Sequence, residues 1–378
     1  MGTAYLLDAG GPLKRFNLKY YASRIEVVSR VGVVLSVANP GRRPRLEDVA
    51  ADVGVSTASV SLVLRGVPGP SAQTRERVLE AAARLGYRPD RTASLLARRR
   101  THLLGVPVVL RDAFRAELAE EVQVAADERG YSVALGAVTP AHDEGRVVET
   151  LLDLRCEALL LLSPELGADA LAQLGSRVPT VVVGRNVEPS GFDVVRVSDD
   201  QGVGQAVDHL VGLGHRHVVH VDGGAAPMAA DRRTGFLAAA RRHGLDGARV
   251  VPGGYDEAAG AAAARLLLGE PSLPTAVVAA NDRSSIGLLD VFLRAGVRVA
   301  GDVSVVGYDD SALARLAHVD LTTVSQEARA QAGHAVEAAV ERLDGDRTEA
   351  RQVVLTPRLV VRGTTGPPRR IHQETQWK

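Results

Sequence analysis

The chain has 378 residues, of which 46% are hydrophobic and 24% charged, a length typical of two or three globular domains. Its only cysteine is Cys156, which excludes an intramolecular disulfide and favours a reducing compartment. No apolar run of about 18 residues occurs, so we expect no transmembrane helix, and residues 1–40 lack the order of a secretory signal.

The formal net charge is zero, but the charge is distributed unevenly. Residues 41–101 hold twelve arginines against six acidic residues, a net charge of +6, and residues 1–40 add +3. Residues 102–378 therefore carry −9. A basic head on an acidic body is typical of a DNA-binding module fused to a second module.

Two short helices joined by a tight turn are expected near the start of the basic segment. Apolar residues recur at helical spacing in two stripes, Leu46, Val49, Ala50 and Val53, then Val60, Val63 and Leu64. Gly54 follows the first stripe as a helix stop, and Ser56 can cap the second helix.

The outer side of the second helix carries small side chains and hydroxyls where an ordinary surface helix carries long charged ones. These residues are Ser56, Thr57, Ala58, Ser59, Ser61, Leu62 and Arg65. Such a face fits a DNA major groove, where hydroxyls reach phosphates and apolar groups meet thymine methyls. An ordinary helical hairpin is the alternative for this stretch alone.

A third helix is expected after its cap Ser71, with a buried face of Val78, Leu79, Ala82 and Leu85. Three segments carry a family resemblance through their order and spacing: LEDVAADVGVSTASVSLVL, TRERVLEAAARLGYRPDRTASLLA and HLLGV. In their order and spacing the chain resembles the lactose-repressor (LacI/GalR) family of bacterial transcription regulators.

The resemblance implies roles for the second helix. Thr57, Ala58 and Leu62 would read bases, while the serines would contact phosphates and the groove. Many members carry arginine where Leu62 stands, so thymine-methyl or shape readout is expected at this position instead of guanine reading.

The resemblance also implies a role for the segment that follows the third helix. Residues 91–97, including Arg91 and Ala93, would form a hinge helix that folds only on DNA and enters the minor groove. Leu96 stands where the family inserts a leucine wedge, which unstacks a base step at the operator centre.

From Leu103 onward, apolar runs alternate with helical patterns. A first series consists of LLGVPVVL, YSVALGAV, EALLLLS and PTVVVG, and a second of VVRVS, HVVHVDG, ARVVPG, TAVVAAND and VSVVGYDD. This spacing predicts two α/β lobes with doubly wound parallel sheets and a ligand cleft between them. Chain crossovers are expected near Val195, Ser325 and Thr356. The resemblance implies a periplasmic-binding-protein-like core.

The expected organisation has five parts: an unmatched extension at 1–43, a helix-turn-helix domain at 44–90, a hinge at 91–102, an effector-binding and dimerisation core at 103–363, and a tail at 364–378. Residues 1–43 match nothing in the family. A disordered extension, a misassigned start and a basic arm that adds phosphate contacts all stay open.

Candidate effector contacts lie where strands of the second lobe end. Arg232, Asn281 and Asp309 supply a guanidinium, an amide and a carboxylate, which can bind vicinal hydroxyls of a sugar or nucleoside. The resemblance adds Tyr255 as a stacking aromatic, Gln326 at a crossover and Phe114 on the wall of the first lobe. Strand-end capping is the alternative for the polar residues, and core packing for the two aromatics.

Other patterns are weaker. His215, His217 and His220 have a metal-like spacing, but no acidic or cysteine partner follows, so no metal is expected, and no cofactor either. No phosphate-binding glycine loop or nucleophile motif occurs, which argues against an enzyme. The tail after Gly363 lacks leucine heptads, so a dimer is expected rather than a coiled-coil tetramer.

The sequence therefore predicts a cytoplasmic, nucleoid-associated transcription regulator, expected to be a repressor. It would bind a palindromic double-stranded DNA operator as a homodimer, without membrane contact, and change its DNA affinity on binding a small effector, a sugar or nucleoside. A periplasmic-type sugar-binding transport protein is the alternative. It would need a secretory signal and would leave the helix-turn-helix unexplained.

Overall fold

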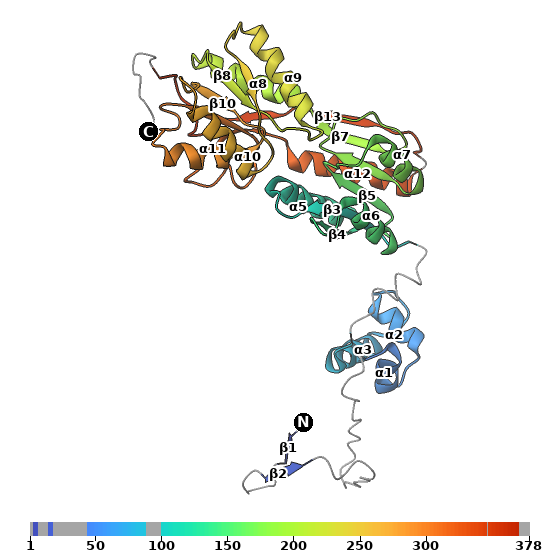
Figure 1. Cartoon of the computed structure of the whole chain (residues 1–378). Helices are drawn as coiled ribbons and strands as arrows, with labels where there is room; N and C mark the ends of the chain where they lie inside the picture. The colour runs from blue at the N-terminus through green and yellow to red at the C-terminus, as the bar shows by residue number, and fades with distance from the viewer. Residues whose placement is uncertain (1–2, 7–13, 18–43, 88–99, 346, 370–378) are drawn as a thin grey trace. The chain divides into compact units, whose positions relative to one another are not determined.

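The computed structural model describes residues 3–6, 14–17, 44–87, 100–345 and 347–369 (Figure 1). The chain divides into two compact units, Met1–Ser94 and Leu95–Lys378. Within the described residues, no helix has both the length and the apolar character needed to cross a membrane.

The first unit contains a small helical bundle. Its helices are α1 (Leu46–Val53), α2 (Thr57–Leu64) and α3 (Ala72–Leu85), and an antiparallel pair, β1 (Thr3–Leu6) and β2 (Lys14–Asn17), precedes them. Gly54 ends α1 in the left-handed region at φ 73°, which glycine adopts without strain. The predicted two-helix unit is thus present, and its apolar stripes meet α3 in one core.

One predicted core position of α3 is wrong. Leu79 is 49% exposed, whereas Val78, Ala81 and Ala82 are buried. Because each residue of a helix turns by about 100°, the stripe that starts at Val78 continues at Ala81 and Ala82, and Leu79 faces outward.

Arginines of the basic segment 41–101 donate hydrogen bonds within this bundle. Arg77 Nη2 donates to the carbonyl of Val53 at 2.6 Å, at the end of α1. Arg75 Nη2 donates to the carbonyl of Val67 at 3.0 Å, just beyond α2. Cations at helix C-terminal carbonyls stabilise the helix. Part of the positive charge therefore stabilises the fold of the head.

The first lobe of the second unit is built on a six-stranded sheet of order β13-β7-β6-β5-β3-β4, in which every pairing is parallel. Its strands are β3 (Leu103–Val109), β4 (Ser132–Val138), β5 (Ala158–Leu162), β6 (Thr180–Val183), β7 (Asp193–Val197) and β13 (Gln352–Leu355). Its helices are α5 (Ala113–Glu128), α6 (Glu144–Asp153), α7 (Ala168–Arg177) and α12 (Ala328–Asp344).

The second lobe has the sheet order β14-β12-β11-β10-β8-β9, parallel except for the β12–β14 pair. Its strands are β8 (Val218–Val221), β9 (Arg249–Val251), β10 (Ala276–Val278), β11 (Ser304–Asp309), β12 (Thr322–Ser325) and β14 (Arg358–Val360). Its helices are α8 (Asp199–Gly212), α9 (Ala229–Arg242), α10 (Glu257–Leu268) and α11 (Asp282–Arg294).

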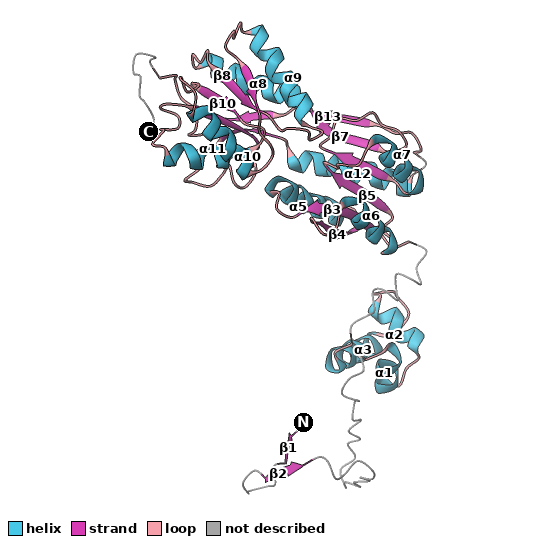
Figure 2. Cartoon of the chain, in the orientation of Figure 1, coloured by secondary structure: helices cyan, strands magenta, loops and turns pink. Residues whose placement is uncertain are grey.

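Helices cover both faces of each sheet (Figure 2). In the first lobe, α5 and α12 pack on one face and α6 and α7 on the other. In the second, α10 and α11 pack on one face and α8 and α9 on the other. Adjacent strand residues such as Leu160 and Leu161 therefore enter different cores, and all of β5 is buried. The predicted fold class is confirmed.

The chain passes between the lobes three times: between β7 and α8, between β12 and α12, and between β13 and β14. The prediction that VVRVS opens the second lobe is wrong, because β7 pairs with β6 and β13 in the first sheet. Its apolar character fits either sheet, and only the pairing partners distinguish them.

Candidate functional site

The exposed side of α2 is the candidate DNA-reading surface. Ser56 caps α2, since its Oγ accepts a hydrogen bond from the amide of Ser59 at 3.1 Å. Thr57 and Ala58 are exposed, and Leu62 is half-buried. The first turn therefore presents a hydroxyl and a methyl group with little side-chain bulk, as a close approach to base edges requires.

Two further predicted contacts lie at the end of the same helix. Arg65 is exposed, and its Nε donates to the carbonyl of Ser61 at 3.1 Å. Its guanidinium is thus held beside the helix terminus, next to the half-buried Ser61. The predicted hinge residues Arg91, Ala93 and Leu96 lie outside the described residues.

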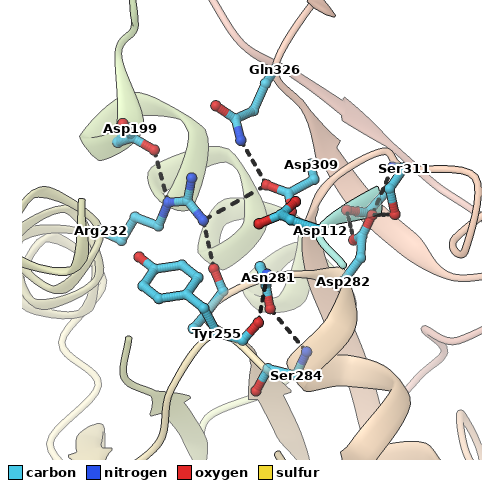
Figure 3. Close-up of polar contacts among 12 residues, drawn as sticks. Asp112, Asp199, Arg232, Tyr255, Asn281, Asp282, Ser284, Asp309, Ser311 and Gln326 are labelled. Atoms are coloured by element: carbon cyan, nitrogen blue, oxygen red, sulfur yellow. Dashed lines mark hydrogen bonds and ion pairs between the residues drawn. The ribbon is translucent and has the colours of Figure 1, made fainter. Parts of the chain in front are cut away.

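Arg232 is the centre of the candidate effector site in the second unit (Figure 3). It lies on the first turn of α9 and is 3% exposed. Its Nε donates to Asp199 Oδ1 at 2.8 Å and its Nη1 to the carbonyl of Ala280 at 2.6 Å. Its guanidinium carbon lies 3.7 Å from the ring centroid of Tyr308. Although burial opposes the charge, the carboxylates and tyrosines around Arg232 raise its pKa.

Asp309 ends β11 and is brought to Arg232 by the strand order. Its Oδ1 lies 3.9 Å from Arg232 Nη1 and accepts a hydrogen bond from Gln326 Nε2 at 2.6 Å. Burial raises the pKa of Asp309 well above the usual carboxyl value, and Arg232 opposes that rise. The backbone φ of Asp309 is 121°, a region that L-residues rarely adopt. The predicted group of Arg232, Asp309 and Gln326 is therefore assembled with local backbone strain.

Asn281 and Tyr255 complete this group. Asn281 caps α11 by accepting from the amide of Ser284 at 2.9 Å, and its Nδ2 donates to the carbonyl of Tyr255 at 3.2 Å. The Tyr255 ring centroid lies 5.5 Å from the Arg232 guanidinium, and the same ring lies so close to Gly223 that it leaves no room for a Cβ there. No described group bonds the Tyr255 hydroxyl, although it is buried.

A cavity of about 540 Å³ opens between the lobes next to these residues. Phe114, from α5 of the first lobe, lines it together with Asp309, while its ring also joins the core of that lobe. Arg232 lies deeper and is not part of the lining. The rim is bridged by Glu117 of α5, which accepts from the amide of Ala312 and pairs with Arg315 Nη2 at 2.5 Å. Both lobes thus contact each other at the mouth of the cavity.

Two of the three histidines, His215 and His220, have ordinary structural partners. His215 bonds Thr275 Oγ1 at 3.0 Å and the carbonyl of Gly366 at 2.8 Å. His220 Nδ1 lies 3.0 Å from the carbonyl of Val278. Among the described residues, no group of three or more histidine, cysteine or acidic side chains is arranged to hold a metal ion.

Sequence reasoning missed two carboxylates of the site. Asp199, at the start of α8, is 3% exposed and pairs with Arg232. Asp112 caps α5 in the first lobe and raises the pKa of Asp309 through its charge, after the larger effects of burial and of the charge of Asp282. Both follow the carboxyl end of a strand, which was the available signal.

Comparison with known proteins bears on both units. Residues 45–90 match the model of the bacterial regulatory proteins of the lacI family, and residues 207–365 match that of the periplasmic binding protein-like domain. The chain is 34% identical over 334 residues to the HTH-type transcriptional regulator CelR of Thermobifida fusca, covering 85% of this chain and 98% of that protein.

Two solved structures are similar along most of the chain. The lac repressor dimer bound to operator and the anti-inducer ONPF has a TM-score of 0.74 at 29% identity, covering 86% of this chain and all of that one. The complex of the transcriptional regulator CelR with cellobiose has a TM-score of 0.62 at 31% identity, covering 85% and 100%.

These relatives are transcriptional regulators and not enzymes, and the transport-protein alternative is not favoured because it leaves residues 45–90 unexplained. The chain belongs to the LacI family of bacterial DNA-binding transcriptional regulators.

Proposed function

We propose that the protein is a repressor that binds a palindromic operator as a homodimer in the cytoplasm, on the nucleoid, and catalyses no reaction. A small uncharged sugar in the cavity between the lobes would change its affinity for DNA. The observation that carries the proposal is the buried group around Arg232 at the carboxyl ends of the strands, in a chain that also has a lacI-type helix-turn-helix.

On the DNA side, Thr57, Ala58 and Leu62 would face base edges, and the nearby serines and Arg65 would contact the phosphate backbone. The exposure of the first turn of α2 supports this assignment. Residues 91–97 would act as the hinge, with Leu96 as a wedge in the minor groove. The operator-bound lac repressor dimer supports the proposal of a dimer on a symmetric site.

On the effector side, the charges around the cavity favour a neutral ligand. Six of its lining residues are acidic and two are basic: Glu117, Glu120, Glu121, Asp309, Asp310 and Glu327 against Arg315 and Arg329. Arg232, deeper in, is already paired with Asp199. An anionic ligand such as a sugar phosphate would meet net repulsion, whereas sugar hydroxyls can donate to these carboxylates. The cellobiose complex of CelR supports a sugar.

The proposed mechanism is a shift between two arrangements of the lobes. Arg232 is 3% exposed and Glu117 pairs with Arg315 between the lobes, so we expect a ligand to reach Arg232 when the lobes move apart and this contact opens. A ligand that binds one arrangement more tightly shifts the population toward it, and the affinity of the dimer for DNA changes by the same coupling free energy.

Ligand binding tests this proposal through thermal stability. Cellobiose, glucose and ribose are compared with glucose 6-phosphate, and at about 100 times its dissociation constant a ligand adds roughly 2.7 kcal/mol of stability. We expect a shift with an uncharged sugar and none with the phosphate. A shift with the phosphate alone would contradict the argument from charge.

A pair of variants on the same helix connects binding to the site. Arg232→Lys keeps the positive charge but loses the planar fork, so sugar affinity should fall by about tenfold or more. Arg242→Lys is the matched control, since Arg242 is the last residue of α9, pairs with Asp208 of α8 and is about half exposed. Equal affinities of the two variants would exclude Arg232 from the binding site.

A further inference from the structure

Arg100, the residue that follows the undescribed segment 88–99, makes a dense set of contacts at the point where the chain enters the first lobe. Its Nε donates to Glu157 Oε2 at 3.0 Å, its Nη1 to Asp344 Oδ1 at 2.8 Å and its Nη2 to the hydroxyl of Tyr131 at 2.7 Å. One guanidinium thus joins the residue before β5, the last residue of α12 and the residue before β4.

The neighbours of Arg100 reinforce this arrangement. The amide of Thr101 donates to the other oxygen of Glu157, and its hydroxyl to the carbonyl of Arg155 at 2.8 Å. The hydroxyl of Tyr131 also bonds Asp344 Oδ1 at 3.0 Å. An isolated surface ion pair contributes little, but a guanidinium held by several partners in a fixed geometry defines the path of the backbone.

Asp344 connects this arrangement to the candidate effector site, because Asp344 is the last residue of α12 and the first turn of α12 lies beside that site. Two residues before α12, Gln326 donates to Asp309, and the carbonyl of Gln326 accepts from Gln331 Nε2 at 2.7 Å. At 1.5 Å per residue, the 17-residue α12 spans about 25 Å.

The packing of α12 makes it a rigid connection along that length. Its inner face is alanine-rich and fully buried in the same core as α5, with Ala335, Val336 and Ala339 at 0% exposure. Closely packed interiors transmit displacements instead of absorbing them. A movement of the Gln326 end should therefore reach Asp344, and through it Arg100.

We propose that Arg100 is a positioning residue, which sets the direction of the chain between the core and the DNA-binding unit and through which α12 couples that direction to the effector site. The proposal rests on the proposed function, because it assumes a specific operator. Arg100 itself would not contact DNA bases or the effector.

The test measures the affinity of the full-length protein for a palindromic duplex, selected from a random library, and for random duplex. Arg100→Gln and Asp344→Asn should each lower the affinity for the palindrome by about tenfold, within the usual range of coupling between linked sites. Affinity for random duplex and the melting temperature of the core should change little. Arg100→Lys should recover part of the loss.

The two substitutions should also be non-additive, since they remove the same interaction. Arg177→Gln is the matched control, because Arg177 pairs with Glu149 on the surface of the same lobe, with both side chains more than half exposed. The proposal is overturned if Arg100→Gln binds the palindrome as tightly as Arg177→Gln does. If the wild type itself shows no preference for any palindrome, the proposed function fails instead.

Discussion

Arg232 is 3% exposed, so its charge is balanced by protein groups and not by solvent. Asp199 supplies the opposite charge, Asp309 Oδ1 lies 3.9 Å from Arg232 Nη1, and Tyr255 and Tyr308 supply ring faces. Removing one partner of a buried pair leaves an uncompensated charge, which costs about 3–5 kcal/mol. Complete removal of Arg232 would therefore mix a loss of stability with a loss of binding, and the lysine variant is the more informative one.

The burial of His220 predicts a pH dependence of the stability of the protein. His220 is fully buried, stacks on Phe236 at 5.3 Å and leaves Nε2 without a partner among the described residues. Burial lowers the pKa of His220 from 6.5 to about 4. In the unfolded state the imidazole is protonated below pH 6.5, whereas in the folded state it is protonated only below about pH 4. The free energy of unfolding should therefore fall by about 3 kcal/mol as the pH decreases through this window.

His220→Gln removes this titration while keeping a donor for the carbonyl of Val278. Burial raises the pKa of Asp282 to about 6, which has the opposite effect on the pH dependence, so the comparison must be made between variant and wild type. The free energy of unfolding, measured with urea, should decrease less between pH 6.5 and pH 4 for His220→Gln than for the wild type. His142→Gln serves as the control, because His142 is exposed. Parallel curves for wild type and His220→Gln would contradict the prediction.

At the scale of the element, α2 and α3 both begin with a serine N-cap, but only α2 is proposed to contact DNA. Ser56 accepts from the amide of Ser59 at 3.1 Å, and Ser71 accepts from the amide of Thr74 at 3.2 Å. Replacing either serine by alanine should cost about 1 kcal/mol of stability in the helical bundle.

Only Ser56 belongs to the candidate DNA-reading surface, so the two caps separate folding from DNA binding. Ser56→Ala should weaken operator binding by about fivefold more than Ser71→Ala, which matches a lost phosphate contact of about 1 kcal/mol. Thermal melting and fluorescence anisotropy with one operator duplex measure the two quantities. Equal losses of DNA affinity in both variants would mean that α2 contributes no contact through Ser56.

Element positions could be predicted from the sequence where the signal is local. The stripe Leu46, Val49, Ala50 and Val53 and the caps of α2 and α3 are set by neighbours within a few residues. The sheet to which β7 belongs could not be predicted, because it depends on pairing with β13, more than 150 residues away.

The same reasoning applies to the candidate site. Polar residues at strand ends stand out from apolar runs, and this pattern together with the family resemblance predicts Arg232, Asn281 and Asp309. The pairing of Arg232 with Asp199 could not be predicted, because it joins the starts of two helices that lie 33 residues apart in the sequence. The contacts of Arg100 with Asp344 span the whole core and leave no local pattern in the sequence.

At the scale of the whole molecule, the central claim is that one chain couples a sugar site to an operator-binding head. The first unit supplies a basic three-helix bundle, and the second supplies two doubly wound lobes around a cavity. Coupling requires that the ligand bind two states with different affinity, and typical couplings change DNA affinity by roughly 5–150-fold.

The most direct measurement is a fluorescence-anisotropy titration of the full-length protein with a palindromic duplex selected from a random library, with and without the sugar that raises its melting temperature. We predict that the palindrome binds at least about 1,000-fold more tightly than random duplex. The sugar should change that affinity by at least about fivefold. Equal affinity for palindrome and random duplex, unaltered by the sugar, would contradict the account.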